Sequence, residues 1–187
     1  SPGIVSINLG TSGSVQYYAD NHHVHINGLL SNLLWSSNSK HYFLVEGTIN
    51  TCNSLFYWLE DHLNIPHKQM KWDERCEKTK TRGVLVPDIT GIASPYWAQP
   101  KKTVFYNLNN ATDNEIIRAG MESIGFFVHD IMQTLKKDGF EITSIQSAGG
   151  GARKPLLQFM ADLLNIPVKR SKIKDKTASG VFRLLFR

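Results

Sequence analysis

The sequence predicts an α/β fold in which helices cover a sheet. Short β-branched segments follow one another near the start of the chain, which indicates an antiparallel meander. In the second half, strand-like segments alternate with segments that have the apolar spacing of helices, an order typical of α/β architecture. The chain has 187 residues, enough for one sizeable core and too few for two comfortable domains. We therefore expect a single domain over residues 1–187.

The first elements are short strands separated by turns. Residues 4–9 alternate between apolar and polar positions, are rich in β-branched side chains, and end in the glycine turn Gly10–Gly13. By the same criteria we expect further short strands over residues 14–18, 23–26 and 42–45.

The middle of the chain begins with a helix and ends in a long connection. The helix is predicted by one apolar face made of Cys52, Leu55, Phe56, Leu59 and Leu63. Pro66 ends it, and the mostly charged residues 67–80 are expected to form a surface helix or loop. Residues 83–86 are predicted to be a buried strand because the run is fully apolar. The connection over residues 87–102 is of a length often associated with function.

The strongest helix signal starts at Thr112. Thr112 and Glu115 have the spacing of a capping box, and Gly139 supplies a C-terminal stop. Between them lies an apolar stripe made of Ile116, Ile117, Met121, Ile124, Phe127, Val128, Ile131 and Leu135. The elements expected after it are a strand over 142–146, a helix over 156–164, a strand around Val168 and a last helix from Thr177.

The formal net charge of +5 comes largely from two clusters of basic residues. They are Lys68, Lys71, Arg75, Lys78, Lys80 and Arg82, then Lys169, Arg170, Lys172, Lys174 and Lys176. A solvated face is the simplest interpretation, and attraction of a polyanionic ligand is the alternative. Because the basic residues are not regularly interleaved with aromatic ones, we expect no nucleic-acid partner.

Other function classes are disfavoured by what the chain contains. It has no apolar stretch of membrane-spanning length and no signal-peptide pattern at Ser1, so we expect no membrane partner. Cys52 and Cys76 form no CxxC motif, which predicts a reduced, cytoplasmic protein without a disulfide framework or a zinc site. Residues 22–25 contain three histidines, but adjacent strand residues face opposite sides, so a surface turn is expected rather than a metal site. We also find no pair of side chains that predicts a catalytic dyad.

Two glycine-rich turns are the best candidates for ligand contact. Gly10–Gly13 and Gly149–Gly151 each follow a short apolar run, and glycine lets backbone N–H groups approach phosphate oxygens closely. Two such turns far apart in the sequence suggest one nucleotide held from two sides. An ordinary hairpin turn and a tight strand-to-helix connection are the corresponding structural interpretations.

Six ordered motifs over nearly the whole chain resemble the C-terminal domain of the FGGY carbohydrate kinases, which include glycerol, xylulose and gluconate kinases. Asn8–Gly13 looks like the family's phosphate-binding hairpin turn, and Gly91–Trp97 is similar to its GxxAPYW loop. The other similar segments are Glu46–Thr48 with the helix to Leu59, Ile117–Ile124, Ala148–Ala152 with Gln158–Leu164, and Thr177–Gly180. We expect the side chains of Pro95, Tyr96 and Trp97 mainly to cover the core.

The resemblance implies a ribonuclease H-like domain of the actin and hexokinase kind, with a mixed sheet flanked by helices. It implies the ATP-binding lobe of an enzyme that transfers the γ-phosphoryl group of ATP, with Mg²⁺ on the phosphates, to a sugar or polyol hydroxyl. The implied partners are ATP or ADP and, mainly through an N-terminal lobe, the substrate; a homodimer is left open. The implied nucleotide-binding residues are Gly10, Thr11, Ser12, Gly13, Asn53, Gly149, Gly150, Gly151 and Arg153.

The sequence also departs from the family pattern. The family's general-base aspartate lies upstream of the hairpin, so the resemblance implies that the N-terminal lobe and the catalytic base are absent from this chain and that the chain is inactive alone. Asn53 and Tyr57 stand where glycerol kinases have glycine and glutamine, and Arg153 stands where asparagine or serine is frequent. These departures motivate an alternative, a non-catalytic actin-like module for nucleotide binding or assembly.

Overall fold

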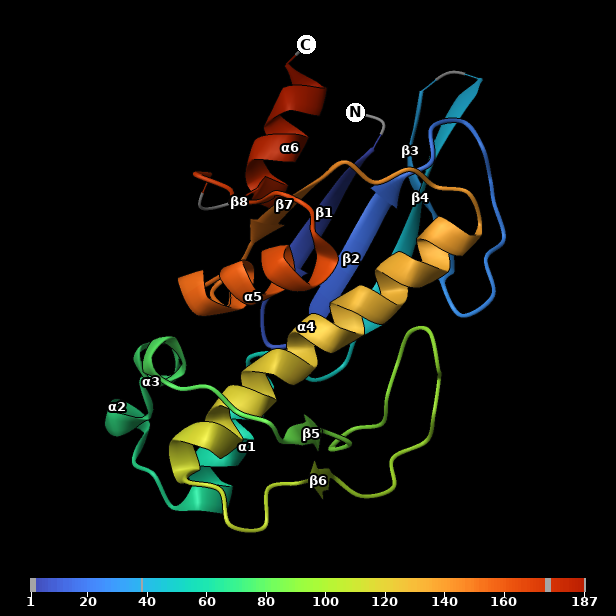
Figure 1. The fold of residues 1–187 in the computed structure, drawn as a ribbon. Coiled ribbons are helices and arrows are strands. Elements are labelled where there is room, and N and C mark those ends of the chain that lie inside the picture. Colours follow the sequence, from blue (N-terminus) through green and yellow to red (C-terminus); the bar gives the residue numbers. More distant parts are fainter. Residues whose placement is uncertain (1–2, 38, 174–175, 187) are drawn as a thin grey trace.

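The computed structural model describes residues 3–37, 39–173 and 176–186, and a six-stranded mixed sheet forms the centre of this part of the chain (Figure 1). Four of the strands pair antiparallel with one another, in the order β3-β4-β2-β1. Their bounds are Ile4–Leu9 for β1, Gly13–Tyr18 for β2, Leu30–Ser37 for β3 and Lys40–Ile49 for β4. The predicted meander is confirmed, but the strand expected at 23–26 is wrong, because the segment is irregular and the chain pairs only from Leu30 onward.

The other side of β1 carries the parallel part of the sheet. β7 (Ser144–Ala148) pairs in parallel with β1, and β8 (Val168–Arg170) pairs in parallel with β7. The carboxyl ends of β1 and β7 therefore lie at the same edge, and each is followed directly by one of the glycine-rich turns. This register brings the two turns together.

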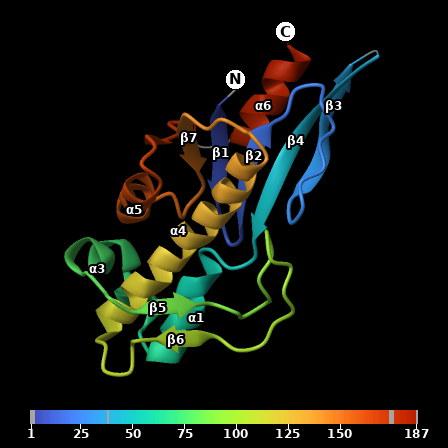
Figure 2. The same cartoon turned by 45° about the vertical axis from the view of Figure 1, so that its right-hand side comes forward.

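The predicted long helix is α4, Asp113–Lys137, which crosses one face of the sheet (Figures 1 and 2). Its capping box is present as predicted: the Thr112 side chain accepts from the Glu115 amide, and the Glu115 carboxylate accepts from the Thr112 amide at 2.8 Å. This second bond lowers the pKa of Glu115. Gly47 lets α4 approach β4 closely, because a Cβ there would lie 2.4 Å from Ile131 Cγ2.

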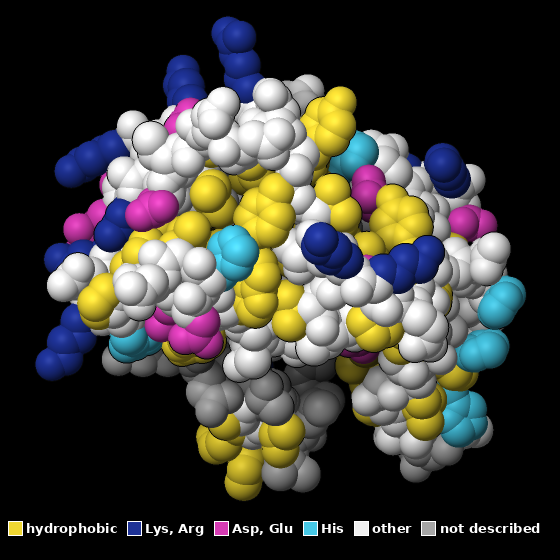
Figure 3. Space-filling view, turned by 90° about the horizontal axis from the view of Figure 1, so that it is seen from below, with side chains coloured by type: hydrophobic (Ala, Val, Ile, Leu, Met, Phe, Trp, Pro, Cys, Tyr) yellow, Lys and Arg dark blue, Asp and Glu magenta, His cyan; other side chains and the backbone are white. Residues whose placement is uncertain are grey.

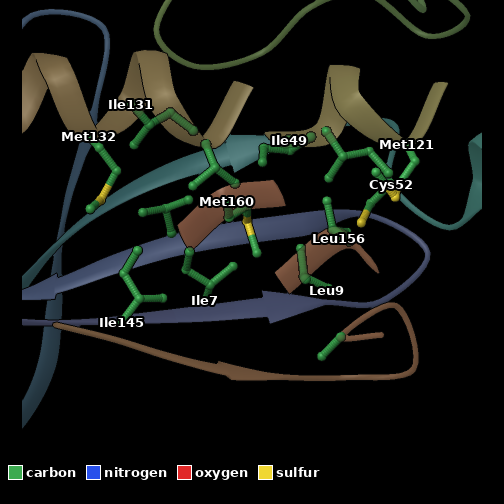
Figure 4. Packing of buried hydrophobic residues seen from close by; sticks show 14 of the residues in the cluster. Ile7, Leu9, Ile49, Cys52, Met121, Ile131, Met132, Ile145, Leu156 and Met160 are labelled. Carbon is green, nitrogen blue, oxygen red and sulfur yellow. The ribbon is translucent and has the colours of Figure 1, made fainter. Parts of the chain in front are cut away.

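Side chains from this helix and from the sheet make one continuous core. Figure 4 shows Ile7 of β1 and Ile145 of β7 on the side of the sheet that faces Ile131 and Met132 of α4, with Leu9 of β1 farther along, next to Leu156. α5 (Lys154–Leu164) adds Leu156 and Met160 to the same core. The exposed positions of β1 alternate with the buried ones, as predicted from the alternation of the sequence.

Apart from the last helix, the remaining elements lie at the end of the sheet next to the glycine turns (Figure 1). α1 (Ser54–Leu63) follows β4, and the charged segment after it forms two short helices, α2 (His67–Met70) and α3 (Trp72–Lys78). The predicted strand at 83–86 is β5 (Val84–Val86); it pairs with β6 (Val104–Tyr106) in a separate two-stranded sheet. α6 (Lys176–Leu185) follows β8 and begins one residue before Thr177, where this helix was predicted to start. Among the described residues no helix is long and apolar enough to cross a membrane.

Candidate functional site

The hairpin turn between β1 and β2 is attached to the start of α1 by hydrogen bonds. The Thr11 carbonyl accepts from the amides of Cys52 and Ser54, each at 3.2 Å, and the Gly10 carbonyl accepts from the Asn53 amide at 3.0 Å. The Ser54 hydroxyl adds a bond to the same Thr11 carbonyl. Within the described part of the chain, the amides of Thr11 and Ser12 themselves donate no hydrogen bond. The turn is therefore held through its carbonyl groups, while these two N–H groups stay available.

The second glycine turn, between β7 and α5, lies against the end of β1. The Gly151 amide donates to the Leu9 carbonyl at 2.8 Å. Gly149 has φ +94°, and a Cβ there would lie 2.3 Å from the same carbonyl oxygen. Only glycine combines this conformation with so close a backbone contact. The turn is thus fixed to the strand that leads into the first turn.

Asn53, the residue before α1, completes the junction. A Cβ on Gly151 would lie 2.8 Å from Asn53 Oδ1, and one on Gly150 would lie 3.6 Å from Asn53 Nδ2. The structure therefore brings the predicted site residues of both turns, from Gly10 to Gly13 and from Gly149 to Gly151, around the first turn of α1. Arg153, the last of the predicted residues, directly precedes α5 and borders the same region.

A hollow of about 360 Å³ opens beside this junction. Its walls come from α1, from α2 and α3, and from the second glycine turn, and include Asn53, Tyr57, Glu60, Gly150 and Arg153. Its lining also includes Phe56 and Trp72, whose rings stack with centroids 4.2 Å apart and an interplanar angle of 2°. A larger hollow of about 670 Å³, lined by Lys80, Arg82 and Asn107 among others, touches neither turn.

Charged side chains form ion pairs at the smaller hollow and beside it. Arg153 Nη1 lies 2.7 Å from Asp73 Oδ2, and the guanidinium stands 5.9 Å from the centre of the Trp72 ring. Lys154 pairs with Glu77 at 2.7 Å, and this carboxylate raises the pKa of the ammonium group. The expectation that the first basic cluster is only a solvated face is wrong for Arg75, which bonds to the carbonyls of Met70 and Gln69 and to Asn114.

The loop Gly91–Trp97, which lies in the long connection over residues 87–102, is attached to the end of β4 by hydrogen bonds. The Thr48 amide donates to the Ser94 hydroxyl at 3.0 Å, and Asn50 Nδ2 donates to the carbonyls of Thr90 and Gly91. The expectation that Tyr96 and Trp97 cover the core is wrong, because they are 58% and 50% exposed. They are held at the surface instead, by bonds from Tyr96 to Asp130 and from Trp97 to the Gly28 carbonyl.

The two cysteines and the three histidines of residues 22–25 provide neither a reactive thiol nor a metal site among the described residues. Burial raises the pKa of each thiol, Cys52 and Cys76, to about 12, so both stay protonated near neutral pH. His22, His23 and His25 are exposed in the irregular segment before β3. The described residues contain no group of three or more His, Cys, Asp or Glu side chains that could hold a metal ion. Part of the second basic cluster, Lys174, lies outside the described residues.

Sequence reasoning missed the residues that shape the hollow from α3. Trp72 is a lone aromatic residue in a charged segment, and Asp73 lies 80 positions from its partner Arg153. The isolated tryptophan was the only available signal. Figure 3, which shows the molecule from below Figure 1, has hydrophobic side chains gathered at the centre of this end of the molecule, with charged groups around them.

Comparisons with known proteins agree with this architecture. The model of the FGGY family of carbohydrate kinases, C-terminal domain, matches residues 5–187. The glycerol kinase of Lactococcus lactis is 30% identical over 185 residues, which are 96% of this chain and 37% of the relative. The glycerol kinase of Alkaliphilus oremlandii is 35% identical over 159 residues, 82% of this chain and 32% of the relative. The chain thus spans about a third of the length of these relatives.

Solved structures show the same fold. The glycerol kinase of Plasmodium falciparum, a crystal structure with ADP, is 25% identical with a TM-score of 0.86 over 96% of this chain and 37% of that one. A ligand-bound xylulose kinase from Lactobacillus acidophilus has a TM-score of 0.83 at 19% identity, over 97% of this chain and 38% of that one. The predicted fold class, a mixed sheet flanked by helices in the manner of actin- and hexokinase-like ATPase domains, is confirmed. This chain belongs to the FGGY family of carbohydrate kinases, as a C-terminal domain.

Proposed function

We propose that this chain is the ATP-binding lobe of a kinase that phosphorylates a hydroxyl group of a sugar or polyol. The observation that carries the proposal is the junction of the two glycine turns with α1, beside a hollow of about 360 Å³. The glycerol kinase structure with ADP supports a nucleotide as the ligand class.

The hairpin turn suits the phosphates of a nucleotide, and the hollow suits its nucleoside. The amides of Thr11 and Ser12, which donate no bond within the described residues, suit phosphate oxygens, and the side-chain hydroxyl groups of the same residues can add donors. The hollow, whose lining is mostly polar and includes the rings of Phe56 and Trp72, suits the nucleoside, because a ribose and the edge of a base carry several hydrogen-bonding groups. Mg²⁺ would arrive bound to the phosphates and offset their charge.

Phosphoryl transfer also needs a carboxylate near the attacking hydroxyl and a surface that holds the substrate. We assign both to a lobe outside this chain, since the relatives are about three times as long. The chain alone is then expected to bind nucleotide without transferring phosphate. Its location in the cytoplasm and its oligomeric state stay predictions.

A second candidate, a non-catalytic binding or assembly module, is favoured by one observation. Arg153, one of the predicted ligand residues, is already paired with Asp73 within the protein.

Titration of the protein with ADP and with Mg²⁺-ATP, followed by calorimetry, separates the kinase lobe from a module that serves assembly alone. Saturable one-to-one binding of the nucleotides supports the kinase lobe. No binding, together with stable self-association in ultracentrifugation, supports the module. For the parent enzyme, the absence of ATP-dependent phosphorylation across a panel that includes glycerol, xylulose and gluconate would overturn the kinase assignment.

A further inference from the structure

An ion pair joins two elements across the mouth of the nucleotide hollow. Asp73 lies in the first turn of α3, and Arg153 is the residue before α5. Arg153 Nη1 lies 2.7 Å from Asp73 Oδ2, and Arg153 Nε donates to the Gly150 carbonyl at 3.3 Å. The same guanidinium stands over the Trp72 ring, at 5.9 Å from its centre. Three different contacts therefore fix the orientation of one side chain.

The pair also separates two cavities. The hollow of about 360 Å³ and a second one of about 420 Å³ share four lining residues, Asp73, Glu74, Gly150 and Arg153. The second hollow continues toward Lys154 and Arg170. The ion pair thus forms part of the wall between them, and with the pair in place the first hollow still has room for a ligand.

The guanidinium keeps donors for a ligand. An arginine has five N–H groups in a planar fork, and the bonds described above use one on Nη1 and the one on Nε. Arg153 lines the hollow that contains Phe56 and Trp72. Oxygen and nitrogen acceptors of a ribose or a purine are the chemistry that such a fixed donor recognises.

We propose that Arg153 is a nucleoside-recognition residue and that Asp73 is the positioning residue that holds its guanidinium in the wall of the hollow. This inference rests on the proposed function. The pair closes the nucleotide hollow on the side of the second cavity and presents free N–H donors to the nucleoside, whereas the hairpin turn serves the phosphates. The two halves of the ligand are therefore recognised by independent parts of the site.

The test is the variant Asp73→Asn, which keeps the side-chain size and removes the charge. Its affinity for ADP and for adenosine is expected to fall about two- to fivefold, because the pair is partly exposed, at 48% for Arg153 and 28% for Asp73. Its affinity for inorganic tripolyphosphate, which contains no nucleoside, is expected to stay within the error of the wild-type value. In about 1 M NaCl the difference between the variant and the wild type should shrink, since the Debye length falls to about 3 Å.

Glu77→Gln is the matched control. Glu77 lies on the same helix and pairs with Lys154 of α5, also at 2.7 Å, but it does not line the first hollow. This control should bind all three ligands as the wild type does, and Asp73→Glu, which restores the carboxylate, should recover most of the lost affinity. Denaturant unfolding of each variant shows whether the fold is retained.

The outcomes separate this inference from the function on which it rests. Wild-type protein that binds none of the three ligands overturns both. Wild-type protein that binds ADP while Asp73→Asn binds it equally well overturns only the role of the ion pair. An equal loss for tripolyphosphate and adenosine would mean a general disturbance of the site and would also overturn it.

Discussion

The two glycine turns differ in why they contain glycine. At Gly149, φ is +94° and a Cβ would come 2.3 Å from the Leu9 carbonyl oxygen, so packing within the protein demands glycine. At Gly10, a Cβ would meet only the Ser12 carbonyl oxygen at 3.5 Å, an ordinary contact. The second turn is therefore explained by the fold, whereas nothing in the described structure requires glycine at the start of the first.

This difference teaches how to weigh a glycine-rich motif. A glycine that the fold requires says little about a ligand, because it would be needed in an inert protein as well. The fold does not require glycine at Gly10, and the neighbouring amides of Thr11 and Ser12 donate no hydrogen bond within the described residues. Together these two observations point to a ligand that approaches the backbone. The evidence for a phosphate site thus lies mostly in the hairpin turn.

The largest expected effect tests whether packing within the protein requires glycine at Gly149. Gly149→Ala should lower the free energy of unfolding by about 3 kcal/mol or more, because backbone strain and a clash with a main-chain oxygen add together. Urea unfolding measures the change. Gly139→Ala is the control: Gly139 also has a positive φ, +84°, but a Cβ there would meet nothing within 4 Å. It should cost only the strain, about 1 kcal/mol. Equal costs for the two variants would show that the contact with Leu9 is unimportant.

The next largest effect tests whether the hairpin turn Gly10–Gly13 contacts the phosphates of a nucleotide. Thr11→Arg should weaken ADP binding at least about tenfold, or about 1.4 kcal/mol, because a bulky side chain would crowd the exposed turn where the phosphates are expected. Its free energy of unfolding should change little, since the structural bonds of Thr11 are made by its carbonyl. Calorimetric titration gives the affinity. Ser36→Arg adds the same charge at an exposed position of β3 and should bind ADP normally. A normal affinity for Thr11→Arg would remove the hairpin from the proposed site.

A smaller effect is expected where the two turns meet at Asn53. Gly151→Ala should cost about 1 kcal/mol, because the neighbour at 2.8 Å is a side-chain amide that can move. Asn53 makes no side-chain capping bond to α1, so Asn53→Ala removes this neighbour without removing a cap. When Gly151→Ala is introduced into the Asn53→Ala background, its cost should fall below about 0.5 kcal/mol. Additive costs in a denaturation cycle would mean that Asn53 does not limit the space beside the turn.

The sequence predicted the parts of this site that local signals specify. The capping box at Thr112, the alternation of β1 and the two glycine turns each occupy a few neighbouring residues, and each was found where it was expected. β3 escaped because Leu30–Ser37 is mostly exposed on both faces, so its pairing with β4 leaves no alternation in the sequence. β6 escaped because it has only three residues and depends on β5 as its partner.

The ion pair in the wall of the hollow could not be predicted from the sequence, for a different reason. Asp73 and Arg153 are charged residues in charged segments, where a solvated face is the ordinary interpretation. Only the packing of α3 against α5 brings them together, and no pattern within either segment encodes that distance. Turns and caps are therefore predictable from single segments, while ion pairs between segments are not.

The smallest expected effect on stability is the one that decides how the first turn is interpreted. Gly10→Ala should leave the free energy of unfolding unchanged or raise it by up to about 1 kcal/mol, since alanine fits in the folded protein and restricts the unfolded chain. The same variant should still weaken ADP binding if phosphate oxygens approach the turn, because the added methyl group occupies their side of the backbone. Unfolding and titration of one protein sample measure both quantities. A destabilisation above about 1 kcal/mol would show that the fold needs glycine here as well, and the hairpin would then be no better evidence for a ligand than the turn at Gly149.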